Sequence, residues 1–302
     1  TGGRRRGALW GRPAPCERSF PRVVCLGWCH TLPAVFSAER YLARIGLDAQ
    51  IGPPSVDLLA ALQLAHLIRV PFENLHAFHH RGVRTDVEWS YAKVVEQQRG
   101  GWCFELNGAF GALLRRLGFA VDYASCRVWE ADLADWGPRH DHLGLIVHAD
   151  GARWFVDVGF GDCCIHPLLV ESGERVAVPR AARLDLGGAA FTLTELMSAG
   201  SAGSAPAPSE WEPQLHVALQ PVSMPVFERR STFLQTQPGL SWTEKAFATR
   251  ALDATGSRVT LRMDVLRSRD GTGAWTESAV SSSEEWRALL MEHFALDDGN
   301  VR

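Results

Sequence analysis

The spacing of apolar residues changes along the chain, and this change predicts two structural regions. From 37 to 118, apolar residues recur with the 3.6-residue period of amphipathic helices. Ser37 and Ser55 have the side chain of a helix N-cap, and Gly118 suits the residue after a helix. We therefore expect a bundle of helical segments that begin near residues 37, 55, 90 and 103.

From residue 119 onward, apolar and polar residues alternate, as they do in strands with one buried face. Strands are expected at 121–124, 143–147 and 154–158, with further short strands to about 196. Ser, Gly, Ala and Pro dominate 198–213, and this composition predicts a flexible loop. After the loop, the pattern indicates strands at 217–219, 246–250 and 259–263 and a closing helix at 283–294. The chain is therefore predicted to have an α+β fold.

The chain has 302 residues, of which 46% are hydrophobic, and a formal net charge of -3. We expect a soluble protein, because no charge excess favours nucleic acid or a membrane surface and no apolar run is long enough to span a bilayer. Residues 1–36 differ, since they are rich in arginine and poor in acids. A transit peptide, an upstream extension and an expression artefact all fit this composition. We expect a non-catalytic extension outside the core.

Seven cysteines without framework spacing indicate a reducing compartment, and we expect a cytoplasmic protein. Cys25, Cys29 and His30 resemble half of a zinc site, but no second pair of ligands accompanies them. The adjacent Cys163 and Cys164 lack the spacing of a redox-active Cys-x-x-Cys pair. The cysteine pattern therefore predicts no metal site.

Cys103 has a position that suits a nucleophile. It lies in the first turn of a predicted helix, where free N–H groups and the helix dipole favour a thiolate. Gly100 and Gly101 precede it and let backbone approach closely. The alternative is that Cys103 is a small buried hydrophobic residue, as most free cysteines are.

A predicted hairpin brings a histidine and a carboxylate together. Asp150-Gly151 is a strong signal for a two-residue turn, and its register places His142 and Asp157 on one face as diagonal neighbours. A surface histidine and a solvated aspartate are the alternatives. Apolar residues flank Asp157, however, and a buried carboxylate needs a partner. His140 lies farther from Asp157 in the same register.

Four segments, in this order, resemble motifs of the arylamine N-acetyltransferase family. They are Val-Pro-Phe-Glu-Asn-Leu at 70–75, Arg-Gly-Gly-Trp-Cys-Phe-Glu-Leu-Asn at 99–107, His-Leu-Gly-Leu-Ile-Val at 142–147 and Val-Asp-Val-Gly-Phe-Gly at 156–161. The resemblance extends from about residue 36 to the C-terminus and weakens after 196. It implies that Cys103, His142 and Asp157 form a catalytic triad.

The resemblance also implies an architecture and a set of supporting residues. It implies a helical bundle at 37–118, a central β-barrel at 119–220 and an α/β lid at 221–302. Glu73 and Arg99 match a buried ion pair that braces the cysteine loop, and Asn107 matches a further supporting position. Phe160 matches the aromatic residue that borders the acceptor pocket, while Gly159 and Gly161 match the acyl-donor cleft. We expect an apolar, aromatic pocket to which Phe72, Trp102 and Phe233 also contribute.

The implied activity is ping-pong transfer of an acetyl group from acetyl-coenzyme A, as co-substrate, to a small aromatic amine or hydrazine. Asp141 departs from the family pattern, because relatives commonly carry a small hydroxyl residue before the histidine, near the cofactor. An acid at this position would either repel coenzyme A phosphates or point away from them. An amide synthase acting on a carrier-bound acyl chain, a cysteine hydrolase and a non-enzymatic binding module remain as alternatives. The sequence does not decide the acceptor or the oligomeric state.

Overall fold

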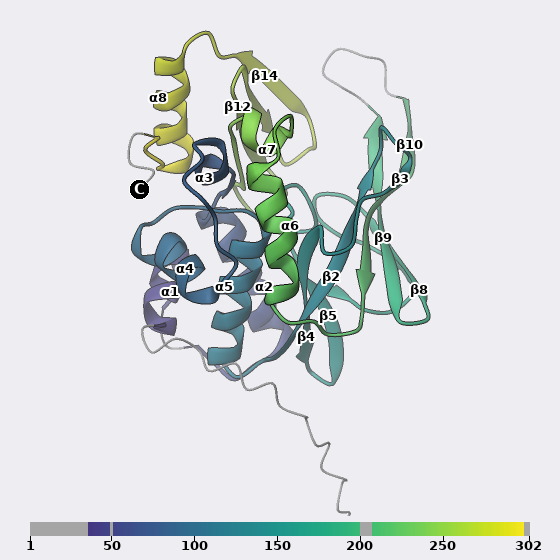
Figure 1. Cartoon of the computed structure of the whole chain (residues 1–302). Helices are drawn as coiled ribbons and strands as arrows, with labels where there is room; N and C mark the ends of the chain where they lie inside the picture. Colours follow the sequence, from purple (N-terminus) through teal and green to yellow (C-terminus); the bar gives the residue numbers. More distant parts are fainter. Residues whose placement is uncertain (1–35, 49–50, 200–206, 299–302) are drawn as a thin grey trace, which may run out of the picture. The chain divides into compact units, whose positions relative to one another are not determined.

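The structure is a computed structural model that describes residues 36–48, 51–199 and 207–298 (Figure 1). The predicted extension lies outside the described residues, except for Phe36. Phe36 is buried and packs against Tyr91, with ring centroids 4.6 Å apart. Phe36, predicted to be the last residue of the extension, therefore belongs to the core instead.

Helices make up the first part of the chain, as predicted. They are α1 (Ala38–Ile45), α2 (Val56–Arg69), α3 (Leu75–Phe78), α4 (Val87–Tyr91), the π-helix η1 (Ala92–Glu96) and α5 (Cys103–Arg116). The hydroxyls of Ser37 and Ser55 accept the N-terminal hydrogen bonds of α1 and α2. Gly118 adopts a φ of +92° after α5, which confirms the predicted end of that helix.

The π-helix η1 was not predicted. It continues directly from α4, and its wider turn carries Lys93, Val94 and Val95 into the interior. Apolar periodicity gives no signal for a π-turn, because only a few residues depart from the α-helical phase.

A central antiparallel sheet follows, in the order β6-β5-β4-β2-β10-β9-β8-β7, with β3 paired to β2. Its strands are β2 (Ala120–Glu130), β3 (Asp135–Trp136), β4 (His142–Ala149), β5 (Ala152–Val156), β6 (Leu168–Leu169), β7 (Gly173–Arg175), β8 (Ala182–Gly187), β9 (Ala190–Ala199) and β10 (Ala207–Ala218). The sheet curves into a nearly closed barrel (Figure 1). Helix α5 packs against β2 and β4.

The β4–β5 hairpin has the predicted register. Ala149 pairs with Ala152, and the ladder continues to Leu145 and Val156. Asp150 and Gly151 have φ of +49° and +77°, as a type I′ turn requires. The hairpin thus brings the start of β4 and the end of β5 to the same edge.

The predicted loop at 198–213 is wrong in part. Strand β9 continues to Ala199 and β10 begins at Ala207, so 198–199 and 207–213 belong to strands, while 200–206 lies outside the described residues. The hydrogen bonds between β9 and β10 stabilise strands in a segment whose composition is typical of a loop. Pro213 lacks an N–H group for this ladder, and the register of the two strands shifts next to it.

A second sheet has the order β1-β11-β12-β13-β14. Its strands are β1 (Phe72–Glu73), β11 (Phe247–Ala251), β12 (Arg258–Arg262), β13 (Val265–Arg269) and β14 (Trp275–Ala279), and the helices of this region are α6 (Pro225–Thr236), α7 (Ser241–Glu244) and α8 (Ser283–Phe294). Phe72 pairs with Thr249, so a segment of the helical part extends the C-terminal sheet. Helices α6 and α7 were not predicted. In the described residues, no helix is long and apolar enough to cross a membrane.

Candidate active site

Cys103 is the first residue of α5, and its side chain is buried. Two glycines let the chain reach this position. A Cβ on Gly100 would lie 2.2 Å from the main-chain oxygen of Pro71, so no larger residue fits. Glu73 N–H donates to Gly101 O at 2.9 Å, which ties β1 to the loop before the helix. The β1 segment therefore fixes where α5 and its thiol begin.

His142 and Asp157 form a buried hydrogen-bonded pair. His142 Nε2 lies 2.5 Å from Asp157 Oδ2, and both residues are less than 5% exposed. Because Nε2 faces the carboxylate, Nδ1 is the ring nitrogen left for Cys103. The hairpin prediction of a His–Asp contact is confirmed. His140 does not compete, since its Nδ1 lies 2.8 Å from the hydroxyl of Ser125.

Asn107 connects the helix of Cys103 to the His–Asp pair. Its amide nitrogen donates to Asp157 Oδ1 at 2.8 Å and to Leu143 O at 2.6 Å, and its oxygen accepts from Val158 N–H at 2.9 Å. Asn107 lies one turn after Cys103, so one side chain holds α5, β4 and the end of β5 in a fixed relation. The predicted supporting position of Asn107 agrees with these contacts.

The loop after Asp157 packs directly against α5 where this helix begins at Cys103. Gly159 N–H donates to Asp157 Oδ1 at 2.8 Å. A Cβ on Gly159 would lie 2.7 Å from Cys103 Cα, so only glycine allows this approach. Phe160 packs its edge on the His142 ring, with centroids 5.2 Å apart. The loop thus holds the carboxylate and encloses the imidazole.

His142 remains protonated over a wide pH range. Burial alone would lower its pKa, but the Asp157 carboxylate and hydrogen bonds to Asp157 and Cys103 outweigh burial and raise the pKa from 6.5 to about 10. An imidazolium beside Cys103 favours the thiolate form of the cysteine. The three side chains can therefore act as nucleophile, base and orienting carboxylate.

His142 is expected to titrate near pH 10. Its raised pKa stabilises the folded protein by an amount that is fully present below about pH 6.5 and is lost as the pH rises through about 10. Ring-nitrogen NMR of histidine-labelled protein over this pH range measures the titration. His140 is the internal control, because burial lowers its pKa and its signal should titrate below 6.5. A His142 signal that titrates near 6.5 would contradict the expectation.

A buried charge network supports the cysteine loop. Lys93 Nζ lies 3.0 Å from Glu105 Oε1 and 3.6 Å from Glu73 Oε1, and all three residues are almost fully buried. Glu105 Oε2 accepts from Trp102 N–H at 3.1 Å, immediately before Cys103. Lys93 was missed by sequence reasoning, because only the π-helix turns its side chain inward.

The predicted ion pair between Arg99 and Glu73 is not formed as such. Among the described residues, the carboxylate of Glu73 pairs with Lys93 instead, and Arg99 Nη1 donates to Asp297 O at 3.1 Å. Arg99 is still near enough to help lower the pKa of Glu73, which burial alone would raise. Both residues support the cysteine loop, but through different partners than predicted, because Lys93 occupies the space between the two glutamates.

Replacing Lys93 with methionine is expected to lower the free energy of unfolding by about 3–5 kcal/mol, because two buried carboxylates lose their shared cation. Urea unfolding at pH 7 measures the effect. Arg40→Met is the matched control, since the Arg40–Glu96 pair is exposed and should contribute no more than about 1 kcal/mol. Equal effects of the two substitutions would show that Lys93 does not neutralise the network.

A cleft of about 970 Å³ opens beside the Gly159–Gly161 loop and the second sheet. Three predicted binding residues, Phe72, Phe160 and Gly161, line it. The other two predicted binding residues do not line the cleft. Gly159 packs against Cys103, and Trp102 packs against the lining residue Trp242, with ring centroids 5.6 Å apart. The predicted role of Phe233 is not supported, since this residue is 42% exposed on α6 and is not a lining residue of the cleft.

The cleft carries basic side chains on its C-terminal wall. Its lining includes Lys245, Arg258, Arg262 and Arg267 together with the aromatic rings of Trp242, Phe247 and Trp275. Sequence reasoning assigned none of these residues, because the register of β11–β14 and not a motif brings them together. Three acids, Asp162, Glu244 and Asp264, also line the cleft, so the four basic side chains leave only a small excess of positive charge for a ligand with anionic groups and an apolar part.

Asp141 does not present an uncompensated charge. Its Oδ1 accepts from Arg230 Nε at 2.6 Å, and α6 supplies this arginine. Asp141 is therefore neutralised in an ion pair. Asp141, the residue that departs from the family pattern, thus has an ion-pair partner within the chain.

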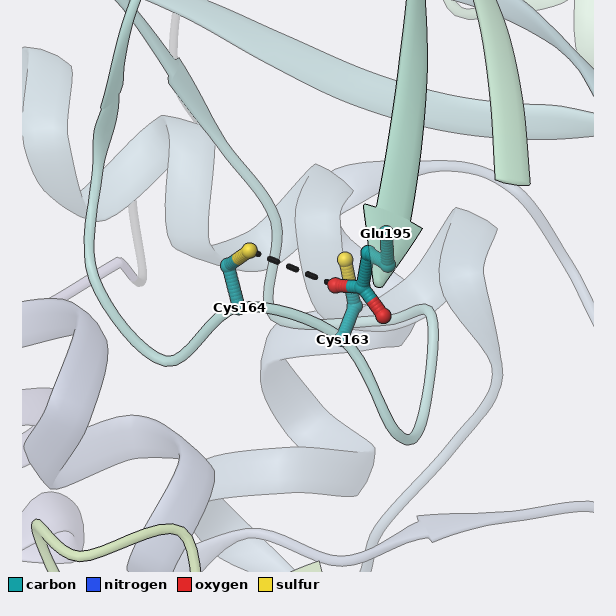
Figure 2. Close-up of side chains that lie close together, drawn as sticks. All are labelled: Cys163, Cys164 and Glu195. Atoms are coloured by element: carbon teal, nitrogen blue, oxygen red, sulfur yellow. Dashed lines mark hydrogen bonds between the residues drawn. The ribbon is translucent and has the colours of Figure 1, made fainter. Parts of the chain in front are cut away.

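Beyond Gly161, the loop carries two cysteines into the interior. The thiols of Cys163 and Cys164 and a carboxylate oxygen of Glu195 all lie within 4.8 Å of one another (Figure 2). These three potential ligand atoms are close enough together to hold a metal ion. In the part of the chain that the structure describes, this is the group of three or more His, Cys, Asp or Glu side chains that meets this condition.

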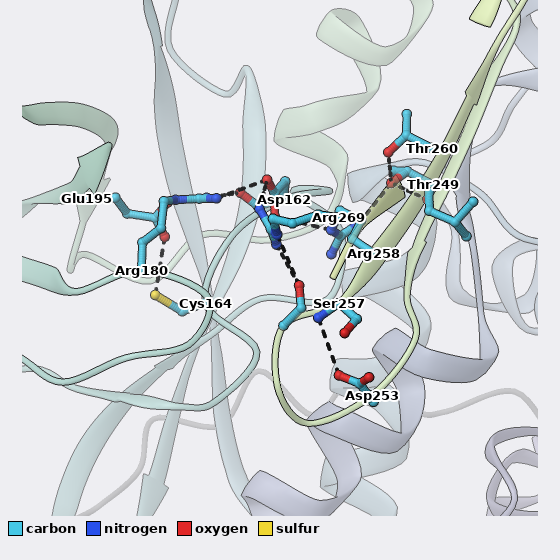
Figure 3. A network of polar contacts seen from close by, with 12 residues as sticks. Asp162, Cys164, Arg180, Glu195, Thr249, Asp253, Ser257, Arg258, Thr260 and Arg269 are labelled. Atoms are coloured by element: carbon cyan, nitrogen blue, oxygen red, sulfur yellow. Dashed lines mark hydrogen bonds and ion pairs between the residues drawn. The ribbon is translucent and has the colours of Figure 1, made fainter. Parts of the chain in front are cut away.

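Asp162 ties the same loop to the second sheet (Figure 3). Its carboxylate lies 2.7 Å from Arg269 Nη1, 3.0 Å from Arg180 Nη1 and 3.2 Å from Arg258 Nε. Burial alone would raise the pKa of Asp162, but the three guanidinium groups lower it to about 2. Asp162 therefore remains an anion and holds the loop between the two sheets.

Comparison with known proteins relates this arrangement to one enzyme family. A family model described as N-acetyltransferase matches residues 55–300. An arylamine N-acetyltransferase of Mycolicibacterium smegmatis is 36% identical over 208 residues, in an alignment that covers 66% of this chain and 70% of that enzyme.

Solved structures extend this similarity to the fold. The M. smegmatis arylamine N-acetyltransferase has a TM-score of 0.78 and 30% identity, over 88% of this chain and 94% of that one. The Mycobacterium marinum arylamine N-acetyltransferase in complex with CoA has a TM-score of 0.77 and 25% identity, over 88% of this chain and 95% of that one.

Proposed function

Because this chain belongs to the arylamine N-acetyltransferase family, we propose that it transfers an acetyl group from acetyl-CoA to the nitrogen of a small arylamine or arylhydrazine. The observation that carries the proposal is the buried His142–Asp157 pair, which lies close enough to Cys103 for the thiol to influence the pKa of the imidazole. The reaction has two half-reactions, and acetyl-Cys103 is the intermediate between them.

In the first half-reaction, His142 holds the proton of Cys103, and the thiolate attacks the carbonyl carbon of the thioester. The C–S bond to coenzyme A breaks, and its sulfur takes the proton from His142. In the second, the amine attacks the acetyl carbon, His142 accepts an amine proton, and the Cys103 thiolate leaves. Asp157 orients the imidazole and stabilises its charge throughout.

Main-chain N–H groups of the first turn of α5 are proposed to hold the oxyanion. Glu105 and Leu106 already donate their N–H groups to Trp102 O, so the N–H groups of Cys103 and Phe104 are the ones that remain for the oxyanion. The close packing of Gly159 on Cys103 keeps the reacting thiol in a fixed position relative to this turn.

We place coenzyme A in the cleft beside the second sheet. A diphosphate needs cationic donors, and the cleft supplies Lys245, Arg258, Arg262 and Arg267. Lys245 and Arg262 fit best, because among the described residues they form no ion pair, whereas Arg258 pairs with Asp162 and Arg267 with Glu277. The Mycobacterium marinum relative solved with CoA supports a coenzyme A site in this family.

The acceptor is proposed to lie against Phe72 and Phe160, which line the same cleft near His142. Aromatic side chains of this kind favour a flat aromatic amine. We also propose a cytoplasmic location and a role in acetylating foreign aromatic amines. The four described cysteines are free thiols, which agrees with a reducing compartment.

Intact mass spectrometry tests the proposal. The chain is mixed with acetyl-CoA and is expected to gain the mass of one acetyl group, which it then loses when an aromatic amine is added. An unchanged mass with acetyl-CoA would refute acetyl transfer by this mechanism and would favour a synthase or hydrolase.

A further inference from the structure

A pair of adjacent thiols lies just behind the candidate active site. Cys163 and Cys164 are about 95% buried, and Glu195 on β9 is fully buried beside them (Figure 2). Cys164 Sγ donates to Glu195 Oε1 at 3.3 Å. The proposed acetyl transfer uses none of these three side chains, so their proximity is not explained by that reaction.

The charge of this group is already balanced. Arg180 Nε donates to the second carboxylate oxygen of Glu195 at 2.9 Å, so the glutamate has one oxygen toward the arginine and one toward the thiols (Figure 3). Hydrogen bonding to Cys164 and burial raise the pKa of Cys163 well above its usual value, and the pKa of Cys164 is also raised. Both cysteines are therefore neutral thiols at neutral pH.

A divalent cation can enter such a group without adding charge. One cation displaces two thiol protons, which pass to the solvent, so the net charge beside Arg180 stays the same. Metal–sulfur bonds of about 2.3 Å at a tetrahedral angle separate two sulfurs by about 3.8 Å. The ligand atoms lie within 4.8 Å of one another, so small side-chain rotations suffice.

We propose that Cys163, Cys164 and Glu195 form a binding site for one thiophilic ion, such as Cd²⁺ or trivalent arsenic. Two thiolates and one carboxylate oxygen are the ligands, and soft sulfur ligands select such ions over Mg²⁺ or Ca²⁺. For arsenite, two As–OH groups leave as water while two As–S bonds form, with no change in oxidation state; the third As–OH group stays and donates a hydrogen bond to the Glu195 carboxylate. The site is separate from Cys103 and acts as an inhibitory site rather than as a resident cofactor site.

The structure couples this site to the His142–Asp157 pair. Gln63 Nε2 donates to Cys164 O at 3.2 Å and to Asp157 O at 3.3 Å. Movement of Cys164 is therefore passed to the segment that carries Asp157 and to the loop that packs against Cys103. An ion bound here is expected to slow acetyl transfer, an effect that rests on the proposed function, whereas binding itself does not.

Binding is tested with CdCl₂ on the full chain carrying Cys103→Ser and serine at the three cysteines of the undescribed N-terminal residues. Calorimetry and the ultraviolet absorption of thiolate-bound metal are expected to give one Cd²⁺ per chain. Cys164→Ser should lower the affinity at least about 100-fold, because even the loss of an outer partner of a metal ligand costs about 10–100-fold. Cys126→Ser, at another buried thiol, is the matched control and should bind as before.

The proposed site would be refuted if the chain bound no Cd²⁺, or if Cys164→Ser left the Cd²⁺ affinity unchanged. Circular dichroism and thermal unfolding check that each variant is folded, and Cys163→Ser provides a second test. Glu195→Gln is not used, because it would also release Arg180. Since this chain lacks the Cys103 thiol, the result is independent of whether the proposed acetyl transfer is correct.

Coupling is tested with arsenite in the presence of excess 2-mercaptoethanol, which removes arsenic from single thiols. Acetylation of the chain with Cys103 intact is expected to be inhibited, and Cys163→Ser/Cys164→Ser should raise the half-inhibiting concentration at least about tenfold. Serine at Cys25 and Cys29 is kept in both proteins, and Cys126→Ser is the control. Inhibition that persists unchanged in the double variant would refute the coupling.

Discussion

Replacing Cys103 with serine is expected to remove the acetyl adduct and to lower the rate of arylamine acetylation by about four orders of magnitude or more. The serine hydroxyl keeps the size of the side chain, but it does not form an anion beside His142 at neutral pH. Both the adduct seen by intact mass and the steady-state rate of acetylation measure this loss. The fold should be retained, because the substitution changes one buried atom at the start of α5.

The control for this substitution is Cys126→Ser. Cys126 is also a buried free cysteine, and it stands on β2 directly opposite His142 in the ladder. Burial raises its pKa well above the usual value, so its thiol stays neutral and should not react with a thioester. We expect the Cys126→Ser protein to acquire the acetyl group as the unchanged protein does. If the acetyl group remained after Cys103→Ser but disappeared after Cys126→Ser, Cys126 and not Cys103 would be the nucleophile.

Replacing Asp157 with asparagine is expected to lower kcat/KM by about 10²–10⁴-fold. The amide keeps an oxygen that can accept from Asn107 and Gly159, so the loop should remain in place. It removes the charge that raises the pKa of His142, and it favours the wrong tautomer of the imidazole. Acetylation of Cys103 should then slow markedly at neutral pH.

The chain offers a matched control for this second substitution. Asp122 and His148 form another His–Asp pair on the same sheet, at 3.2 Å, but both side chains are more than 40% exposed. Asp122→Asn should leave kcat/KM within about twofold, since exposed ion pairs contribute little. If Asp157→Asn also left kcat/KM within about threefold, the role of Asp157 as orienting carboxylate would be refuted. The kinetics of acetyl-enzyme formation and NMR of His142 separate a chemical effect from a loss of fold.

Much of the fold followed from local pattern. Apolar period, N-cap serines and terminal glycines predicted α1, α2 and α5, because each signal lies within one or two helical turns. Where long-range pairing decides the structure, prediction failed. Part of the loop expected at 198–213 is strand, because the end of β9 and the start of β10 pair with each other. The π-helix η1 was missed because its signal is one extra residue in a turn.

The contacts of the candidate active site likewise include some that follow from local sequence and some that depend on long-range packing. Asp150-Gly151 set a register that brought His142 and Asp157 together, since two-residue turns determine pairing over the adjoining strands. Asn107 is also a local consequence, because it lies one helical turn from Cys103. The partner of Glu73 was not predictable in this way, since Lys93 reaches it only from the π-helix. The basic wall of the cleft likewise depends on how β11–β14 pair.

The sequence by itself determined the α+β character, the cysteine at a helix start and the His–Asp hairpin, because each depends on residues close together in the chain. Only the tertiary structure decided that Lys93 neutralises Glu73 and Glu105 and that Asp141 is paired by Arg230. It also decided that Asp162 joins the Gly159–Gly161 loop to the second sheet and that Cys163 and Cys164 meet Glu195. These contacts join segments that are far apart in the chain, and their free energy depends on burial and distance, which local residue patterns do not specify.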